Sequence, residues 1–383
     1  LTHKNIVSNV KALRRNFRNF DKMFSDDALS LSFLPWAHSY GQTCELHSGI
    51  SLGTKIAIAE SVEKLPENLQ EVRPNKLFSV PSLFNKIQQN VTQQMDSSSL
   101  KKSLISKARK YSQTNRESPT WINSHKHQLT DKLVLSKIRD KLGGQLTMCF
   151  TGGASISNEV LQLFEDLGIP IIEGYGLSET TPIISLNEFV YPERKLGSVG
   201  KPLDNLEVRL VDQEIWVSGP SVMNGYHNNP EANAQVFEYL DGKKFFKTGD
   251  LGSLDDQGRL YITGRSKEQY KLENGKYVVP NVVEGLLGLS PLFKYVLMYG
   301  DNREYNILIV VPNEESLTDE LRDQKIINQN LDDTDIYTNF EVSAFLEKYI
   351  HELCQKHEIK KYEIPQKIVL VPDFITETEY ITP

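Results

Sequence analysis

The sequence predicts an α/β protein, in which a large N-terminal domain of parallel α/β sheets with a small β subdomain is followed by a small α+β C-terminal domain. Residues 146–176 run strand, helix, strand, with glycine turns after both strands and apolar residues along one face of the helix. Short strands separated by turns occupy 197–260. After Gly264 the pattern changes to helices and a hairpin, which predicts a domain boundary and a hinge near 264–267.

The composition excludes several classes of protein. The chain has 383 residues, 39% of them hydrophobic and 24% charged, which suits a globular protein of two or three domains. A net charge of −7 argues against a nucleic-acid surface. Cys44, Cys149 and Cys354 lie far apart, which predicts neither disulfides nor zinc and favours a reducing compartment. No run of about 18 apolar residues appears, so we expect no transmembrane span or signal peptide.

The elements before residue 146 follow in order along the chain. The opening LTHKNIVSNV predicts a helix behind Thr2 as its cap. Residues 31–59 predict a buried strand, a proline loop, a helix and a second strand, and residues 75–87 repeat the strand, loop and helix. From Met95 to Lys132 the chain is rich in Ser, Lys, Gln and Asn, which predicts an exposed insertion with some helix.

The C-terminal part contains three recognisable segments. PNVVEGLL at 280–287 predicts a helix, and YVLMYG with NILIVVP, at 295–300 and 306–312, predicts a hairpin. VSAFLEKYIHELCQKH at 342–357 has the spacing of an amphipathic helix. These segments complete the predicted α+β domain.

Two glycine turns fall where ligands bind in parallel sheets, beyond the carboxyl ends of strands. TGGAS at 151–155 joins a strand to a helix N-terminus, where backbone N–H groups can face an anion, although two adjacent glycines also occur in plain tight turns. EGYGLSETTP at 173–182 brackets an aromatic ring between glycines and sets Glu179 among hydroxyls. That carboxylate suits a Mg²⁺ ion that bridges phosphates; the alternative is a polar loop with a core tyrosine.

Three further segments carry chemical side chains. KTGDLG at 247–252 places Asp250 in a turn, where a carboxylate can hold both hydroxyls of a ribose or serve only the turn. GRSKEQYKLENGKYVVP at 264–280 has a basic cluster, which elsewhere is usually a solvated surface, and a turn at Asn274 and Gly275. FLPWAHSYG at 33–41 contains His38, although a lone histidine is more often structural than catalytic.

Together these motifs resemble those of the long-chain fatty acyl-CoA synthetases, in the acyl-adenylate-forming superfamily, and the resemblance covers essentially the whole chain. It implies that ATP activates a fatty carboxylate, with loss of pyrophosphate, and that CoA then takes the acyl group, with loss of AMP. ATP, Mg²⁺, CoA and a long-chain fatty acid are thus the implied cofactors and partners, with an adenylation domain at 1–264 and a mobile lid domain at 265–383. Because long-chain fatty acids partition into bilayers, the resemblance also implies a protein that is cytoplasmic or peripheral on a membrane such as the endoplasmic reticulum. The run from Asp241 to Pro280 resembles the fatty-acyl-specific signature, which favours long acyl chains.

The resemblance also implies a role for each motif position. The nucleotide would be bound by Gly152, Gly153, Ala154, Glu173, Gly174, Tyr175, Gly176, Ser178, Thr180, Asp250, Arg265, Lys267 and Lys271. Within that set Tyr175 would stack on adenine and Asp250 would hold the ribose. Glu179 would bind the metal. The chemistry would involve His38, Glu179, Thr180 and Lys267, the path of CoA would be lined by Gly275, Lys276 and Tyr277, and the acyl pocket by Trp36, Ser79 and Phe84.

Two parts of the family pattern are not found in the sequence. The family has a Ser/Thr/Gly-rich phosphate loop just before the segment that matches LTHKN, and a catalytic lysine just beyond the position of TETEYITP. We therefore expect this chain by itself to be impaired in adenylate formation. Two alternatives stay open, a ligase for a different carboxylic acid and a noncatalytic homologue that binds a nucleotide or an acyl group.

Overall fold

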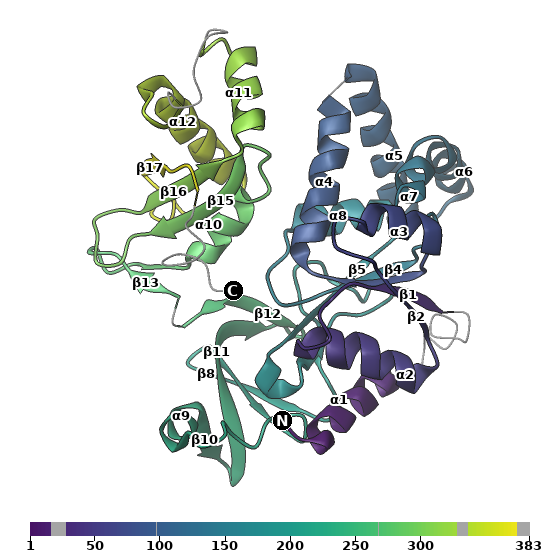
Figure 1. Ribbon diagram of the computed structural model, residues 1–383, viewed down its shortest axis with the longest axis vertical. Coiled ribbons are helices and arrows are strands. Elements are labelled where there is room, and N and C mark those ends of the chain that lie inside the picture. The colour runs from purple at the N-terminus through teal and green to yellow at the C-terminus, as the bar shows by residue number, and fades with distance from the viewer. Residues whose placement is uncertain (17–27, 97, 267, 328–335, 374–383) are drawn as a thin grey trace. The chain divides into compact units, whose positions relative to one another are not determined.

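A computed structural model describes residues 1–16, 28–96, 98–266, 268–327 and 336–373, and the chain divides into two compact units, Leu1–Thr263 and Gly264–Pro383. The first unit contains a seven-stranded sheet in the order β2-β1-β3-β4-β5-β6-β7 (Figure 1). The first five strands in this order are parallel to their neighbours, and β6 and β7 are antiparallel. The strands are β1 (Leu29–Ser32), β2 (Lys55–Ile58), β3 (Lys76–Ser79), β4 (Met148–Thr151), β5 (Ile171–Gly176), β6 (Ile183–Leu186) and β7 (Lys201–Pro202).

Helices cover both faces of this sheet. The core on one face joins Leu13 of the first helix to Phe78, Phe150 and Ile172 of three strands. On the other face Phe84 and Phe164, from two different helices, meet edge to face with ring centroids 5.2 Å apart. The helices of the unit are α1 (His3–Asn16), η2 (Tyr40–His47), α2 (Ser48–Leu52), α3 (Leu65–Val72), α4 (Pro81–Asp96), α5 (Ser99–Glu117), α6 (Trp121–Thr130), η3 (Asp131–Leu135), α7 (Ser136–Asp140), α8 (Asn158–Asp166), η4 (Ser178–Thr180) and α9 (Pro230–Val236).

The strand, helix and strand predicted at 146–176 are confirmed as β4, α8 and β5. All four residues of β4 are buried, as expected for a strand covered on both faces. α8 begins where the Ser157 hydroxyl accepts a hydrogen bond from the amide of Val160, and its apolar side is buried. β4 and β5 are parallel, so the turns that follow them lie at the same edge of the sheet.

A second sheet forms the predicted β subdomain. Its path is β10-β11-β9-β8, and β12 pairs with β11. A core around Ile215, Val217 and Phe246 packs this sheet against Tyr175 and Ile184 of the larger one. The strands are β8 (Glu207–Val211), β9 (Glu214–Ser218), β10 (Phe237–Leu240), β11 (Lys243–Leu254) and β12 (Leu260–Arg265).

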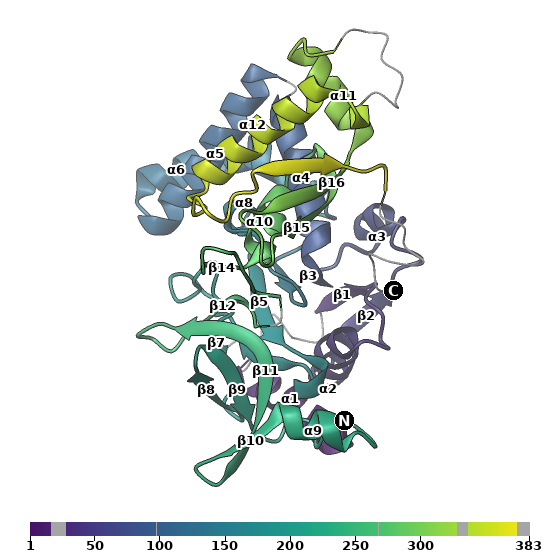
Figure 2. The same cartoon turned by 90° about the vertical axis from the view of Figure 1, so that its left-hand side faces the viewer.

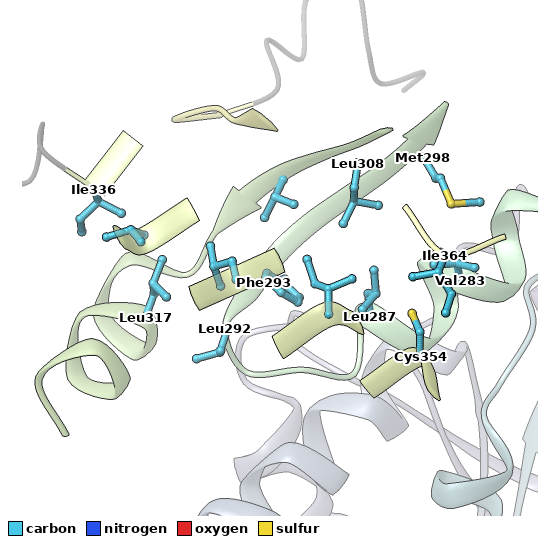
Figure 3. Packing of buried hydrophobic residues seen from close by; sticks show 14 of the residues in the cluster. Val283, Leu287, Leu292, Phe293, Met298, Leu308, Leu317, Ile336, Cys354 and Ile364 are labelled. Atoms are coloured by element: carbon cyan, nitrogen blue, oxygen red, sulfur yellow. The ribbon is translucent and has the colours of Figure 1, made fainter. Parts of the chain in front are cut away.

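The second unit has its own core, as Figure 3 shows in close-up. The predicted hairpin is confirmed as β15 and β16, and β17 extends it as a parallel third strand. The predicted helices are confirmed as α10 and α12, which touch each other and the sheet (Figure 2). The elements are β13 (Tyr270–Lys271), β14 (Tyr277–Val278), α10 (Pro280–Leu287), β15 (Phe293–Tyr299), β16 (Ile307–Pro312), α11 (Glu314–Asp323), α12 (Phe340–Lys356) and β17 (Lys367–Leu370).

The segment from Met95 to Lys132 is more regular than the sequence predicts. Instead of an insertion with some helix, it contains the whole of α5 and the whole of α6. Ile105, Ala108 and Ser112, spaced three and four residues apart, are the buried positions of α5. This stripe is too narrow and too weakly apolar to detect by periodicity, although it suffices to pack the helix against the unit. Among the described residues, no helix is long and apolar enough to cross a bilayer.

Candidate active site

The carboxyl ends of β1, β3, β4 and β5 bring most of the predicted site residues of the first unit to one edge of the sheet. Register pairs Ser79 with Thr151 and Thr151 with Glu173, so the segments that follow these strands begin side by side. The loop after β1 reaches the loop after β5, because the Ser39 and Ser178 hydroxyls are 3.1 Å apart in a hydrogen bond. Segments distant in sequence thus form one candidate site.

The glycine turn after β4 is constrained by its backbone. Gly153 has φ +86°, a backbone conformation that residues other than glycine rarely adopt. A Cβ at this position would meet no atom within 4 Å. Gly152 is buried beside β5, and a Cβ would lie 3.3 Å from the carbonyl of Gly174. Gly153 and Ala154 are exposed. The turn therefore offers open backbone at the carboxyl edge, as an anion or nucleotide site requires.

The loop after β5 doubles back on itself. A Cβ on Gly176 would lie 1.7 Å from the Pro182 carbonyl oxygen, so the close approach that this glycine permits is to the chain itself. Thr180 is fully buried, and its hydroxyl accepts from the Leu177 amide at 3.0 Å and lies 2.5 Å from the Pro182 carbonyl. The hydroxyl of Thr180 is therefore occupied within the loop, whereas Ser178 is exposed.

Two neighbouring segments hold this loop in place. The Met223 amide donates to the Glu179 carbonyl at 2.7 Å, and the Thr181 hydroxyl donates to the Ser221 carbonyl at 2.6 Å. Thr181 has φ +66°, which is strained for a β-branched residue and is maintained by these contacts. From α1, the buried amide of Asn9 donates to the Ile183 carbonyl at 2.8 Å. Neither Asn9 nor the 220–226 segment was selected from the sequence.

The carboxylate of Glu179 is oriented by a tyrosine that the sequence reasoning missed. The Tyr226 hydroxyl donates to Oε1 at 2.8 Å, while Oε2 accepts no hydrogen bond from any part of the chain that the structure describes. Burial and the neighbouring carboxylate raise the pKa of Tyr226 to about 12, so the phenol stays protonated as a donor. The GY pair at 225–226 gives little signal by itself, because glycine beside an aromatic residue is common in loops. A half-buried carboxylate with one oriented oxygen and one open oxygen fits a Mg²⁺ ion that keeps most of its waters.

Tyr175 and Asp250 form a buried pair. The Tyr175 hydroxyl donates to Asp250 Oδ2 at 2.7 Å, and the two residues are 9% and 3% exposed. A bulge in β11 aims Asp250 here, because the Thr248 hydroxyl accepts the Asp250 amide at 3.0 Å and donates to the Ile215 carbonyl at 2.8 Å. The motifs around residues 175 and 250 therefore meet through their central side chains.

Glu173 has structural partners. It is 6% exposed, and its carboxylate accepts the Gly197 amide at 3.2 Å. Burial raises its pKa to about 8, against lowering by hydrogen bonds from Gly197 and Asn187. Glu173 is therefore buried in β5, and its hydrogen bond to Gly197 holds the segment that follows residue 195.

The predicted acyl-pocket residues lie in different surroundings. The Trp36 indole donates to the Ser32 hydroxyl at 3.0 Å, and this hydroxyl donates to the Glu45 carboxylate at 2.6 Å. Burial raises the pKa of Glu45 to about 7. Ser79 is buried at the end of β3. Phe84 is fully buried against Phe164, in the core between α4 and α8. His38 is exposed, and its Nδ1 accepts the Tyr40 amide at 3.3 Å.

The remaining predicted residues belong to the second unit, apart from Lys267, which lies outside the described residues. Arg265 is exposed and 3.7 Å from the Glu268 carboxylate. The predicted turn at Asn274 and Gly275 is confirmed; it joins β13 to β14. Lys271 lies 5.7 Å from the ring of Tyr277, and Lys276 lies 4.6 Å from the ring of Tyr362. The turn therefore carries a small group of cations and exposed aromatic surface.

Comparisons with known proteins agree with this architecture. The family described as AMP-binding enzyme matches residues 1–227. The long-chain-fatty-acid–CoA ligase FadD15 of Mycobacterium bovis is 30% identical over 100% of this chain and 63% of its own length. Long-chain-fatty-acid–CoA ligase 5 of Mus musculus is 33% identical over 83% of this chain and 47% of its own length.

Solved structures share the fold. O-succinylbenzoate coenzyme A synthetase from Bacillus subtilis, in complex with AMP, superposes with a TM-score of 0.61 and 20% identity over 97% of this chain and 62% of its own. The same enzyme has been solved with ATP and a magnesium ion. The chain spans roughly half to 63% of the length of the curated relatives described above.

Proposed function

Because the chain belongs to the AMP-binding enzyme family, as an acyl-CoA synthetase of that superfamily, we propose that its whole protein joins a long-chain fatty acid to CoA at the expense of ATP. The long-chain substrate is supported by relatives that align along the entire chain, one named as a long-chain-fatty-acid–CoA ligase and one as a long chain acyl-CoA synthetase. The single observation that carries the proposal is that the segment with Tyr175, Ser178 and Glu179 meets the segment with Asp250 at one edge of the sheet. The Tyr175–Asp250 hydrogen bond joins them, and the Ser39–Ser178 hydrogen bond adds the loop after β1.

In the first half-reaction the fatty carboxylate attacks the α-phosphorus of ATP and pyrophosphate leaves. Both reactants are anions, so the protein must position them and balance their charge. We assign the open backbone at Gly153 and the exposed Ser178 hydroxyl to the phosphates. The Tyr175–Asp250 pair would hold the adenosine, with the tyrosine hydroxyl fixing the carboxylate that meets the ribose.

Glu179 is the proposed ligand of Mg²⁺, and Tyr226 orients it. The ion would neutralise charge on the phosphates when bound. Thr180 keeps the loop folded in this proposal and does not contact substrate, because its hydroxyl is used by Leu177 and Pro182.

In the second half-reaction the thiolate of CoA attacks the acyl carbonyl and AMP leaves. We assign this step to the second unit, with Arg265, Lys267 and Lys271 towards the nucleotide and the Gly275–Tyr277 turn towards CoA. A rotation about 264–267 between the two steps would exchange one set of groups for the other. His38 stays a candidate contact for the activated carboxylate. Trp36, Ser79 and Phe84 stay candidate residues of the acyl pocket, although the full burial of Phe84 favours a position behind the pocket surface.

The test is ATP–pyrophosphate exchange with palmitate, run on the complete gene product beside the 383-residue chain. Exchange that requires palmitate, followed by formation of palmitoyl-CoA when CoA is added, is the expected result for the complete protein. A series of carboxylic acids separates a long-chain ligase from a ligase for another acid. Nucleotide binding without exchange for every acid would mean a noncatalytic binding protein.

Glu179→Gln tests the metal assignment. The substitution removes the charge and keeps the shape, so we expect exchange to fall by about 100-fold and the remaining activity to need more magnesium. Glu231→Gln, at an exposed position on α9, is the matched control and should leave exchange unchanged. Equal exchange by Glu179→Gln and wild type over a magnesium titration would exclude Glu179 as the metal ligand.

A further inference from the structure

Positive charge is concentrated in the helices α5, α6 and α7. Between Ser99 and Lys141 the sequence has eleven Lys or Arg and three Asp or Glu, a local net charge of +8 in a chain whose total is −7. At one edge of the first unit α5 packs against α6 and α8, and η3 packs against α5, α6 and α7 (Figures 1 and 2). A cationic region therefore stands out against an otherwise acidic protein.

The arginines and the lysines of this region face different surroundings. Arg109 and Arg116 bind the buried Asp166 at 2.8 and 3.1 Å, which attaches α5 to α8. Arg139 binds Asp131 at 2.6 Å, which attaches α7 to η3. The eight lysines are all exposed: Lys101, Lys102, Lys107, Lys110, Lys126, Lys132, Lys137 and Lys141. The excess charge is therefore at the surface.

An apolar stripe lies among these lysines. Trp121, His125, Leu129 and Leu133 recur every four residues along α6 and η3, and Trp121 and His125 are in ring contact with centroids 5.0 Å apart. Trp121, Leu129 and Leu133 are 77%, 62% and 63% exposed, and the neighbouring Ile122 is 57% exposed. None of the residues of α6 is buried, so the rest of the unit does not cover the apolar stripe on this helix.

We propose that this stripe, with Lys126, Lys132 and Lys137 beside it, docks on the surface of an anionic phospholipid bilayer. Tryptophan and leucine would enter the boundary between headgroups and acyl chains, while the lysines would reach the phosphates above it. The charge favours this occupant over a second copy of the chain, because two cationic faces repel each other. The inference rests on the proposed function in one respect: a bilayer is where long-chain fatty acids partition, so docking would bring the ligase to its substrate.

Vesicle sedimentation of the 383-residue chain, without ATP or fatty acid, tests the surface. We expect binding to phosphatidylcholine vesicles that contain phosphatidylserine, weak binding to phosphatidylcholine alone, and release at high salt. Trp121 fluorescence should shift to the blue on binding and be quenched by lipids brominated on their acyl chains. Trp121→Phe should remove that quenched component and leave the signal of Trp36 and Trp216.

Two variants separate the apolar and charged contributions. Trp121→Ser with Leu129→Ser and Leu133→Ser should lower vesicle affinity by about 10-fold or more. Lys126→Glu with Lys132→Glu and Lys137→Glu should abolish the preference for phosphatidylserine. The matched controls, at exposed positions elsewhere in the unit, are Ile58→Ser with Val62→Ser and Lys4→Glu with Lys11→Glu. Circular dichroism should show that every variant keeps its fold.

Equal affinity of the serine variant and wild type for the mixed vesicles would overturn the proposal. So would self-association of the chain that the serine substitutions abolish, in the absence of any vesicle binding, since a second copy would then be the occupant. Vesicle binding is measured without any reaction, so failure of the ligase proposal would leave the docking result unchanged. Failure of docking would likewise leave palmitate-dependent exchange unaffected.

Discussion

At the scale of the residue, the chemistry proposed for the candidate site depends on single side chains, and a neighbouring residue orients each of them. Tyr226→Phe removes one hydroxyl, which donates to Glu179 at 2.8 Å. Loss of a contact that orients a metal ligand typically costs 10–100-fold in metal affinity. We therefore expect the magnesium concentration for half-maximal exchange to rise by about 10-fold, with little change at saturating magnesium. A magnesium titration checks this, with the exposed Tyr239→Phe as control; an unchanged midpoint would assign Tyr226 to folding only.

Glu173 predicts a dependence of stability on pH. Its pKa is about 8 in the folded protein against 4.5 as the ordinary value, because burial penalises the charge. Between these values the folded state binds more protons than the unfolded state, so this group makes the free energy of unfolding fall as pH rises, by up to about 1.4 kcal/mol per pH unit. Glu173→Gln should remove that contribution and gain stability relative to wild type as pH increases from 5 to about 8. Urea unfolding at several pH values measures it, and parallel curves for the two proteins would contradict it.

At the scale of the element, the loops of the candidate site are held by a helix that supplies no reacting group. Asn5 of α1 donates to the carbonyls of Pro220 and Val222 at 2.9 and 2.8 Å, and Asn9 donates to that of Ile183 at 2.8 Å. Asn5→Ala leaves both carbonyls without this partner, so we expect a loss of about 1–3 kcal/mol and a raised KM for ATP. Lys11→Ala, exposed on the same helix, is the control. Urea unfolding and exchange kinetics check both effects, and a destabilised variant with wild-type KM would separate α1 from the site.

The elements themselves could be predicted from the sequence where one physical rule dominates. β4, α8 and β5 were predicted because buried parallel strands are continuously apolar and the helix between them has a clear apolar face. The meeting of Tyr175 with Asp250 was not predictable from spacing, since 75 residues and a different sheet separate them. Asn5 and Asn9 were missed because asparagine inside a helix usually indicates only a weak helix-forming tendency. Their importance here comes from hydrogen bonds to carbonyls of distant loops, which the sequence does not show.

At the scale of the whole molecule, each unit has its own core, so the units should lose structure separately. The cluster that contains Leu308 lies entirely within residues 264–383, whereas Trp36, Trp121 and Trp216 all belong to the first unit. Tryptophan fluorescence therefore reports unfolding of the first unit, and far-ultraviolet circular dichroism reports both. Leu308→Ala should cost about 2–5 kcal/mol in the second unit, which shifts part of the dichroism transition and leaves the fluorescence midpoint unchanged.

Leu161→Ala, fully buried in α8, is the reciprocal variant and should shift the fluorescence transition. A fluorescence midpoint that moves with Leu308→Ala as far as with Leu161→Ala would mean that the units unfold as one cooperative body. Separate transitions would instead show that the second unit is stable independently of the first. A unit with that independence can change its position without unfolding, as the proposed exchange of catalytic groups between the two half-reactions requires.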